Sequence, residues 1–296
     1  MIELLIPARR KDLGGIEVAR LLPWAQRRMV GPFIFFDHIG PVDFAPGIPR
    51  SVDVRPHPHI GLATVTYLFA GEIMHRDSVG SEQPIRPGEV NWMVAGRGIT
   101  HSERFEQARA SGGPMHGIQA WVALPQEAEE TAPGFSHHPA ASLPQWREDG
   151  VSARLIAGRS GGQAAPATTH SPLFYLHWQL DAGARAELAA EYPERAAFLV
   201  EGEVEVDGRP VAAGQMLVFA PGRPVRFHAR RASTLMLLGG EPVGERFIEW
   251  NFVASSRERI EQAKADWRAG RMPLPPGDDR EFIPLPADSP PPEPMS

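Results

Sequence analysis

The segment PGEVNWMVAGRGITHSE (Pro87–Glu103) combines a turn, an apolar strand-like run and two side chains of the kind that bind metals. The proline–glycine pair predicts the turn, and the apolar run after it predicts a β-strand. Gly96 and Gly98 indicate a second, tight turn. Beyond that turn, His101 and Glu103 are two residues apart, so in an extended chain their side chains point to the same face. The segment therefore predicts a strand that presents an imidazole and a carboxylate to one point.

The segment RPHPHIG (Arg55–Gly61) repeats this spacing with a second pair of candidate ligands, His57 and His59. The proline between them favours extended backbone at the first histidine. Taken alone, such a pair is more often two neighbouring surface imidazoles, because metal binding needs a third convergent ligand. Two same-face pairs on two strands form a set of four, however. We therefore expect His57, His59, His101 and Glu103 to bind one metal ion.

The rest of the chain has the pattern of an all-β protein. The 296 residues include 29 glycines and 31 prolines, scattered between short apolar runs. Three runs, Ala63–Gly71, Glu89–Gly98 and Gly117–Leu124, predict neighbouring strands of one sheet. A second strand-rich region begins near Val151 and repeats this pattern. Two similar β-units therefore indicate a duplicated fold, with domains expected at residues 1–134 and 135–270.

The second region lacks the features that mark the candidate site. Arg195–Gly208 predicts a β-hairpin, and Ser233–Gly240 predicts a buried strand. No His-x-His sequence precedes the hairpin, and His228 stands alone. We therefore expect no metal in the second domain and assign it a supporting role.

One helix is predicted near the end of the chain. In SSRERIEQAKADWRAG, Ser255 is a candidate N-cap with Glu258 three residues later, which is a capping-box pattern. An apolar stripe formed by Ile260, Ala263 and Trp267 is expected to pack on a barrel. From Arg271 to Ser296 the chain is proline-rich and predicts neither a regular helix nor a sheet.

Composition excludes several classes of protein. The hydrophobic fraction of 42% and charged fraction of 22% are those of a globular protein, and a formal charge of −6 gives no reason to expect direct binding to nucleic acid. Cysteine is absent, which excludes disulfides and thiolate ligands. The N-terminus lacks a signal-peptide pattern, and no apolar run is long enough to span a membrane. We expect a cytoplasmic protein whose partners are small molecules or proteins.

Three stretches together resemble the pirin family of the cupin superfamily: HPHIG, PGEVNWMVAGRGITHSE and, near the C-terminus, EQAKADWRAGR. The resemblance implies a bicupin, with two tandem cupin-type β-barrels and a short C-terminal helix. It also implies a non-haem iron site formed by His57, His59, His101 and Glu103. The wider cupin pattern places a glutamate where this sequence has Ala63. Glu103 would then be the only carboxylate ligand, as in pirins.

The ligand types leave the metal open. Three imidazoles and one carboxylate suit Fe(II), Mn(II), Co(II), Ni(II), Cu(II) or Zn(II). Resemblance to pirins implies Fe(II), and resemblance to flavonol-cleaving cupins implies a dioxygenase that takes dioxygen and a small aromatic or enolic substrate such as quercetin. Glu103 is also a candidate catalytic base, if it loosens from the metal.

Two other functions fit the same ligand set. The first is a regulatory protein that senses the oxidation state of iron and binds a protein partner, as the resemblance to eukaryotic pirins implies. The second is a zinc or manganese hydrolase or isomerase, because the fold does not decide the reaction. His75 and Asp77 repeat the i, i+2 spacing and could lie near the mouth of the site, although such pairs are more often solvated. His38, His116 and Gln119 could line the pocket, although ordinary packing is the simpler expectation.

Overall fold

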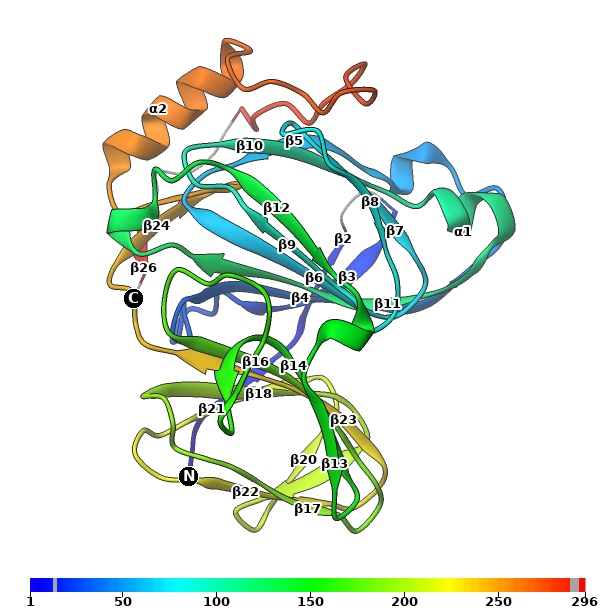
Figure 1. The fold of residues 1–296 in the computed structure, drawn as a ribbon, viewed down its shortest axis with the longest axis vertical. Helices are drawn as coiled ribbons and strands as arrows, with labels where there is room; N and C mark the ends of the chain where they lie inside the picture. Colours follow the sequence, from blue (N-terminus) through cyan, green and yellow to red (C-terminus); the bar gives the residue numbers. More distant parts are fainter. Residues whose placement is uncertain (13–14, 288–292, 296) are drawn as a thin grey trace. The chain divides into compact units, whose positions relative to one another are not determined.

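The computed structural model describes residues 1–12, 15–287 and 293–295, and these are mostly β-strands and loops (Figure 1). This confirms the all-β prediction and the short helix near the C-terminus. The chain forms two compact units. The histidine unit comprises Arg10–Val18, Phe35–Ala140 and Gly244–Ser296, and the companion unit comprises Met1–Arg9, Ala19–Ile34 and Ala141–Val243.

These units differ from the predicted segments 1–134, 135–270 and 271–296, because each unit draws on several stretches of the chain. The strand β12 (Gly134–His138) pairs with β9 (Val90–Val94) in the histidine unit. The helix α2 (Arg257–Arg268) also packs in that unit, although it follows the strands of the companion unit in sequence. The second predicted segment therefore contributes to both units.

Two main sheets lie wholly or largely in the histidine unit. The larger has the strand order β12-β9-β6-β11-β4-β3-β2, and the smaller has the order β5-β10-β7-β8. The remaining strands of the larger sheet are β2 (Arg9–Asp12), β3 (Glu17–Leu22), β4 (Phe33–Phe44), β6 (Leu62–Ala70) and β11 (Gly113–Ala123). The smaller sheet consists of β5 (Val54–His59), β7 (Ile73–Asp77), β8 (Glu82–Ile85) and β10 (Ile99–Arg104). A third sheet consists of β24 (Arg246–Glu249), β25 (Phe252–Ala254) and β26 (Glu293–Met295).

The three strands predicted as neighbours are confirmed. They correspond to β9, β6 and β11, which are adjacent in the larger sheet. Thr64 and Thr66 of β6 are buried with the apolar residues between them, so both faces of this strand are covered. Threonine and the apolar residues of this run favour extended backbone, which explains why the local pattern was informative.

The companion unit also has two sheets. The larger has the order β1-β21-β18-β23-β16-β14-β13, with β15 paired to β14, and the smaller has the order β17-β22-β19-β20. The larger sheet is formed by β1 (Ile2–Pro7), β13 (Gln145–Glu148), β14 (Val151–Ser160), β15 (Gln163–Ala164), β16 (Leu173–Leu180), β18 (Glu194–Glu201), β21 (Gln215–Phe219) and β23 (Ser233–Gly240). The smaller sheet is formed by β17 (Arg185–Leu188), β19 (Glu203–Val206), β20 (Arg209–Ala212) and β22 (Val225–Ala229).

The hairpin predicted over Arg195–Gly208 is wrong. Its two strands, β18 and β19, belong to different sheets: β18 pairs with β21 and β23, whereas β19 pairs with β20 and β22. Gly202 lies between them with φ of +93°, a backbone conformation that favours glycine. The chain bends there from one sheet into the other. The strand predicted over Ser233–Gly240 is confirmed as β23.

The predicted helix forms, with its start displaced by one residue. Ser256 is the N-cap, because its side chain accepts a hydrogen bond from the backbone N–H of Arg259 at 3.2 Å. Ser255 instead donates to Glu129 Oε2 at 2.7 Å. The predicted stripe is buried and packs against Ile60 and Phe252. The other helical segments are short: α1 (Glu106–Ser111), η1 (Arg50–Val52), η2 (Gln126–Ala128) and η3 (Ala140–Ser142).

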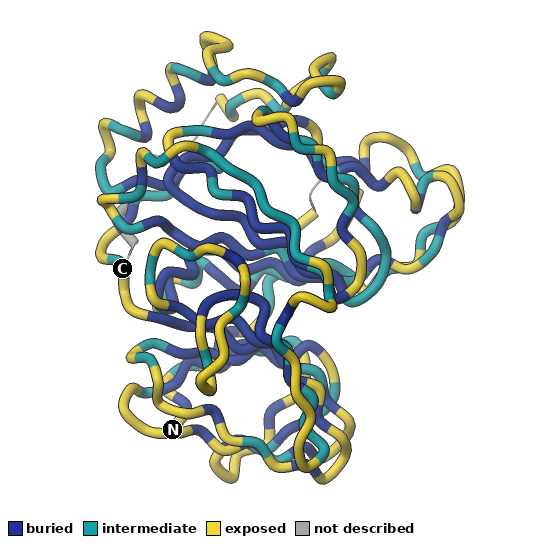
Figure 2. Tube along the Cα trace, viewed as in Figure 1, coloured by how far each residue is buried: buried dark blue, intermediate teal, exposed yellow. Residues whose placement is uncertain are grey.

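The proline-rich tail has no helix or strand from Arg271 to residue 287, and the three-residue β26 is the one departure from the prediction. Burial follows the sheets: the strands are buried along much of their length, whereas the connecting loops are largely exposed (Figure 2). Within the described part of the chain, no helix is both long and apolar enough to cross a bilayer.

Gly96 makes the tight turn that precedes β10. Its φ is +51°, and an added Cβ would lie 2.1 Å from the backbone oxygen of Thr131. We predict that Gly96→Ala lowers the free energy of unfolding by about 3 kcal/mol, because it adds a backbone collision to the cost of a left-handed conformation. Gly80→Ala is the control, since Gly80 has φ of +95° and open space around it. Urea unfolding should show a loss of only about 1–2 kcal/mol there. Equal losses of unfolding free energy in the two variants would contradict the predicted collision between the added Cβ and the Thr131 oxygen.

Candidate metal centre

The antiparallel pairing of β5 with β10 brings the predicted histidines together. In this register His101 lies opposite His57, and Ile99 lies opposite His59. The alternation of side chains along each strand then turns the three imidazoles to one side of the sheet. The three histidines of the two i, i+2 pairs thus lie close together, and their role as metal ligands remains a prediction.

The three imidazoles form a compact and buried group. Their ring centroids are 4.4 Å apart for His57 and His101, 5.0 Å for His57 and His59, and 5.1 Å for His59 and His101. One nitrogen from each ring can be chosen so that all three lie within 4.8 Å of one another. The exposed fractions are 6%, 1% and 1% for His57, His59 and His101. They are therefore not surface imidazoles.

Backbone carbonyls fix the tautomers of two of the rings. His57 Nδ1 lies 2.9 Å from the oxygen of Arg55, and His59 Nδ1 lies 3.0 Å from the oxygen of Asn251. A carbonyl oxygen only accepts hydrogen bonds, so each Nδ1 carries the proton and each Nε2 keeps a lone pair. This arrangement is typical of histidine ligands, whose second nitrogen is held by an outer partner.

His101 differs from the other two. Among the described residues, neither of its ring nitrogens has a hydrogen-bond partner, although both are buried. A buried polar atom without a partner costs free energy, and a bound ion is one of the recognised explanations. The unpartnered nitrogens of His101, together with the unprotonated Nε2 atoms of His57 and His59, fit a divalent transition metal.

Burial keeps the cluster neutral. It lowers the pKa of His57 to about 4, with a further contribution from the nearby His75. Burial and the neighbouring imidazoles also hold the pKa values of His59 and His101 well below the usual range. Only a neutral imidazole can bind a metal, so at neutral pH no proton has to leave these rings before an ion binds.

Glu103 lies on the same strand as His101 but outside the group of three. The register with β5 shifts between His101 and Glu103, so that Glu103 lies opposite Val54. Its side chain is half-buried, and burial raises its pKa to about 7. The carboxylate is therefore not among the atoms that meet within 4.8 Å, and its role as fourth ligand remains a prediction.

His75 and Asp77 are buried beside the cluster, which the sequence did not lead us to expect. His75 Nε2 lies 2.9 Å from Asp77 Oδ2, and the His75 ring stacks on Phe135 with centroids 4.4 Å apart. The same ring lies 5.3 Å from that of His101. Burial alone would raise the pKa of Asp77, but hydrogen bonds from His75 and Ser81 hold it below its usual value. The i, i+2 spacing was the available signal.

The other candidates for the pocket lining make contacts with their neighbours, and their place in the lining remains a prediction. His38 and His116 contact each other, with their Nε2 atoms 2.7 Å apart. Gln119 Oε1 accepts a hydrogen bond from Thr66 at 2.7 Å. Trp121, which was not singled out from the sequence, lies edge-on to His59 with centroids 4.9 Å apart. The apolar wall beside His59 is therefore formed by β11.

The depressed histidine pKa values predict how the stability of the metal-free protein depends on pH. Between the ordinary value of 6.5 and the folded value of about 4 for His57, the unfolded chain binds more protons than the folded chain. The free energy of unfolding should therefore keep its full value above about pH 6.5 and fall as the pH approaches 4. Other buried histidines contribute to this loss of stability as well, so the variant His101→Gln measures part of what the site contributes. Urea unfolding at pH 7.5 and 5.0 should show a smaller decrease in the free energy of unfolding in that variant. The same loss as in the unsubstituted protein would contradict this prediction, and the exposed His170→Ala is the control.

Family models match both halves of the chain. The model described as Pirin matches residues 15–122, and the model described as Pirin C-terminal cupin domain matches residues 175–273. The first of these includes the three histidines and Glu103.

Individual proteins give the same result. A pirin-like protein of Caulobacter vibrioides is 64% identical over 97% of this chain and 100% of its own length. A Pseudomonas aeruginosa protein, provisionally named as a quercetin 2,3-dioxygenase, is 40% identical over 90% of this chain and 83% of its own. The crystal structure of quercetin 2,3-dioxygenase from Acinetobacter baumannii superposes with a TM-score of 0.88 at 32% identity, covering 96% of this chain and 95% of that one. These matches confirm the resemblance and the cupin-type β-fold, and the chain belongs to the pirin family.

Proposed function

We propose that this protein is a mononuclear non-haem metal enzyme, an Fe(II)-dependent dioxygenase that acts on a flavonol-like substrate such as quercetin. The observation that carries the proposal is the convergence of three buried, neutral imidazoles on one point. Relatives and a structural neighbour named for quercetin 2,3-dioxygenase support the choice of reaction and substrate class.

In this proposal His57, His59 and His101 hold the metal through neutral nitrogens, and Glu103 is the fourth ligand. Rotation of the Glu103 side chain is needed for this, because its carboxylate lies outside the group of three. When bound, iron supplies a Lewis-acidic and redox-active centre for a deprotonated substrate oxygen and for dioxygen. Three neutral imidazoles and one carboxylate leave a net charge of about +1 on a divalent site, which favours an enolate or phenolate.

Glu103 is also the proposed base. In this role its carboxylate loosens from the metal. Without a metal, burial raises its pKa to about 7, so the free carboxylate can exchange a proton near neutral pH, where a general base is most effective. Its place on β10, two residues from His101, puts it on the same side of the strand as the ligands. It would accept the proton of a substrate hydroxyl as that oxygen approaches the metal.

The proposed activity predicts metal-dependent oxygen consumption. Protein loaded with Fe(II) under anaerobic conditions should consume dioxygen when quercetin is added, and a chelator should abolish this. His101→Ala removes one of the nitrogen donors, so metal retention should fall by at least tenfold and turnover should be lost. His170→Ala, which changes an exposed histidine in the companion unit, should behave like the unsubstituted protein. Tight metal binding without turnover would count against the dioxygenase and in favour of the regulatory alternative.

Glu103 predicts a pH dependence of metal affinity. Below about pH 7 its carboxyl is protonated in the metal-free protein, so a metal that binds it must displace a proton. Apparent affinity should therefore rise as the pH increases from 5.5 to 7 and level off above 7. Glu103→Gln should bind more weakly and lose this dependence, as measured by competition with a chelator. An unchanged pH profile in that variant would remove Glu103 from the ligand set.

A further inference from the structure

The strand β10 is buried on both faces. His101 and Glu103 point to one side, so Ser102 and Arg104 point to the other. Ser102 is 0% exposed and Arg104 is 5% exposed. Arg104 is a cation on the reverse side of a strand that carries candidate metal ligands, and a buried cation needs partners.

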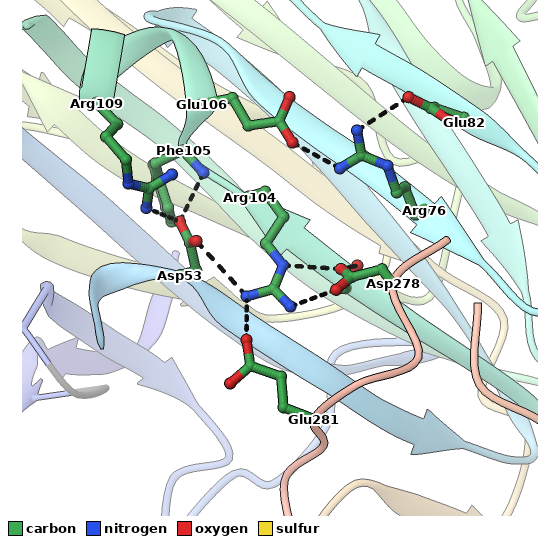
Figure 3. A network of polar contacts seen from close by, with 10 residues as sticks. Asp53, Arg76, Glu82, Arg104, Phe105, Glu106, Arg109, Asp278 and Glu281 are labelled. Carbon is green, nitrogen blue, oxygen red and sulfur yellow. Dashed lines mark hydrogen bonds and ion pairs between the residues drawn. The ribbon is translucent and has the colours of Figure 1, made fainter. Parts of the chain in front are cut away.

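Those partners come largely from the proline-rich tail. We call residues 277–283 the strap. Asp278 Oδ2 accepts from Arg104 Nε at 2.8 Å, and Asp278 Oδ1 accepts from Arg104 Nη2 at 2.6 Å (Figure 3). Asp278 Oδ2 also accepts from Ser102 Oγ at 2.6 Å. Glu281 adds a carboxylate oxygen 3.1 Å from Arg104 Nη1. Asp278 therefore binds both of the buried side chains on the reverse face of β10.

The strap also contacts the other ligand strand. The backbone N–H of Ile283 donates to the oxygen of Pro56 at 2.8 Å, directly before His57. The carbonyl group of the same residue is anchored to α2, because Trp267 Nε1 donates to the Ile283 oxygen at 3.1 Å. Phe282 packs edge-on to Trp267 with centroids 5.4 Å apart. The strap thus joins β5, β10 and α2.

The ligands differ in how much they depend on this support. His57 and His59 are each oriented by a carbonyl oxygen at Nδ1. His101 has no such partner among the described residues, so its position depends on packing and on the backbone of β10. The side chains that hold that backbone from behind are Ser102 and Arg104.

We propose that the strap positions the ligand strand for metal binding, and that Asp278 is the positioning residue for His101. This inference rests on the proposed metal site. A bidentate carboxylate–guanidinium pair is strong and directional, which suits it to fixing a strand to a fraction of an ångström. Residues that orient metal ligands typically change metal affinity by 10–100-fold when they are replaced.

The test uses the full-length protein with Asp278→Asn, which keeps the size of the side chain and removes its charge. We expect Co(II) and Zn(II) affinity, measured by competition with a chelator, to fall about tenfold. The visible absorption bands of the Co(II) protein should also change, because the ligand geometry relaxes. Asp266→Asn is the matched control: Asp266 lies on α2, and its carboxylate pairs with Arg271 Nε at 2.7 Å instead of with Ser102 or Arg104. Its metal affinity and spectrum should be unchanged.

Amide hydrogen exchange of the metal-free protein gives a readout that is independent of any metal. Exchange over Ile99–Arg104 should be faster in Asp278→Asn than in Asp266→Asn. Should Asp278→Asn not fold, Ser102→Ala removes one hydrogen bond, leaves Arg104 paired, and should show the same effects to a smaller degree.

The outcomes separate the two proposals. If Asp278→Asn had the same metal affinity and the same exchange rates over β10 as the control, the proposed role of the strap would be wrong, even if the free energy of unfolding fell. If the unsubstituted protein bound no metal, the proposed function would fail, and unchanged exchange over β10 would then reject the strap as well.

Discussion

The pairing of β5 with β10 is the constraint on which the rest of the site depends. A shift of this register by one residue would turn every side chain of one strand to the opposite face, and the imidazoles of His57 and His101 could no longer meet. Several features hold the register. Gly96 makes the turn before β10, the carbonyl of Arg55 binds the His57 ring, and the backbone of Ile283 bonds to Pro56. The first two features are local in sequence, whereas the bond from Ile283 comes from a distant part of the chain.

The charge of the site is controlled in the same way, through burial. Three imidazoles placed this close would repel one another strongly if they were protonated, and their low pKa values avoid this. The carboxylates are arranged around the neutral group. Asp77 is engaged by His75 and the backbone of its own turn, whereas Glu103 has a raised pKa and so holds a proton that a cation can displace. A metal would therefore enter a site with little charge of its own.

The parts of the structure that follow from local pattern could be predicted from the sequence. The alternation of side chains predicted that the two residues of each pair share one face of a strand, and the apolar runs predicted three adjacent strands. The position of the Glu103 carboxylate could not be predicted, because the spacing fixes the side of the strand but not the conformation of a long side chain, and the structure leaves this carboxylate outside the group of three. The prediction of a hairpin at Gly202 was wrong because the sequence shows that the chain turns there, but not which sheet each strand joins.

Long-range contacts also could not be predicted from the sequence. Burial of His75 depends on Phe135 in β12, and the support of His59 comes from a carbonyl, a group that every residue carries. The strap is neither helix nor strand, so no residue periodicity in the sequence marks it. Side-chain contacts such as those of Asp278 hold it in place. Because Asp278 lies 174 positions from Arg104 in the chain, the two histidine stretches do not contain all the residues that hold them in place. Transplanting those stretches into another barrel would move the donor atoms without the framework that aligns them, so the motif is not portable.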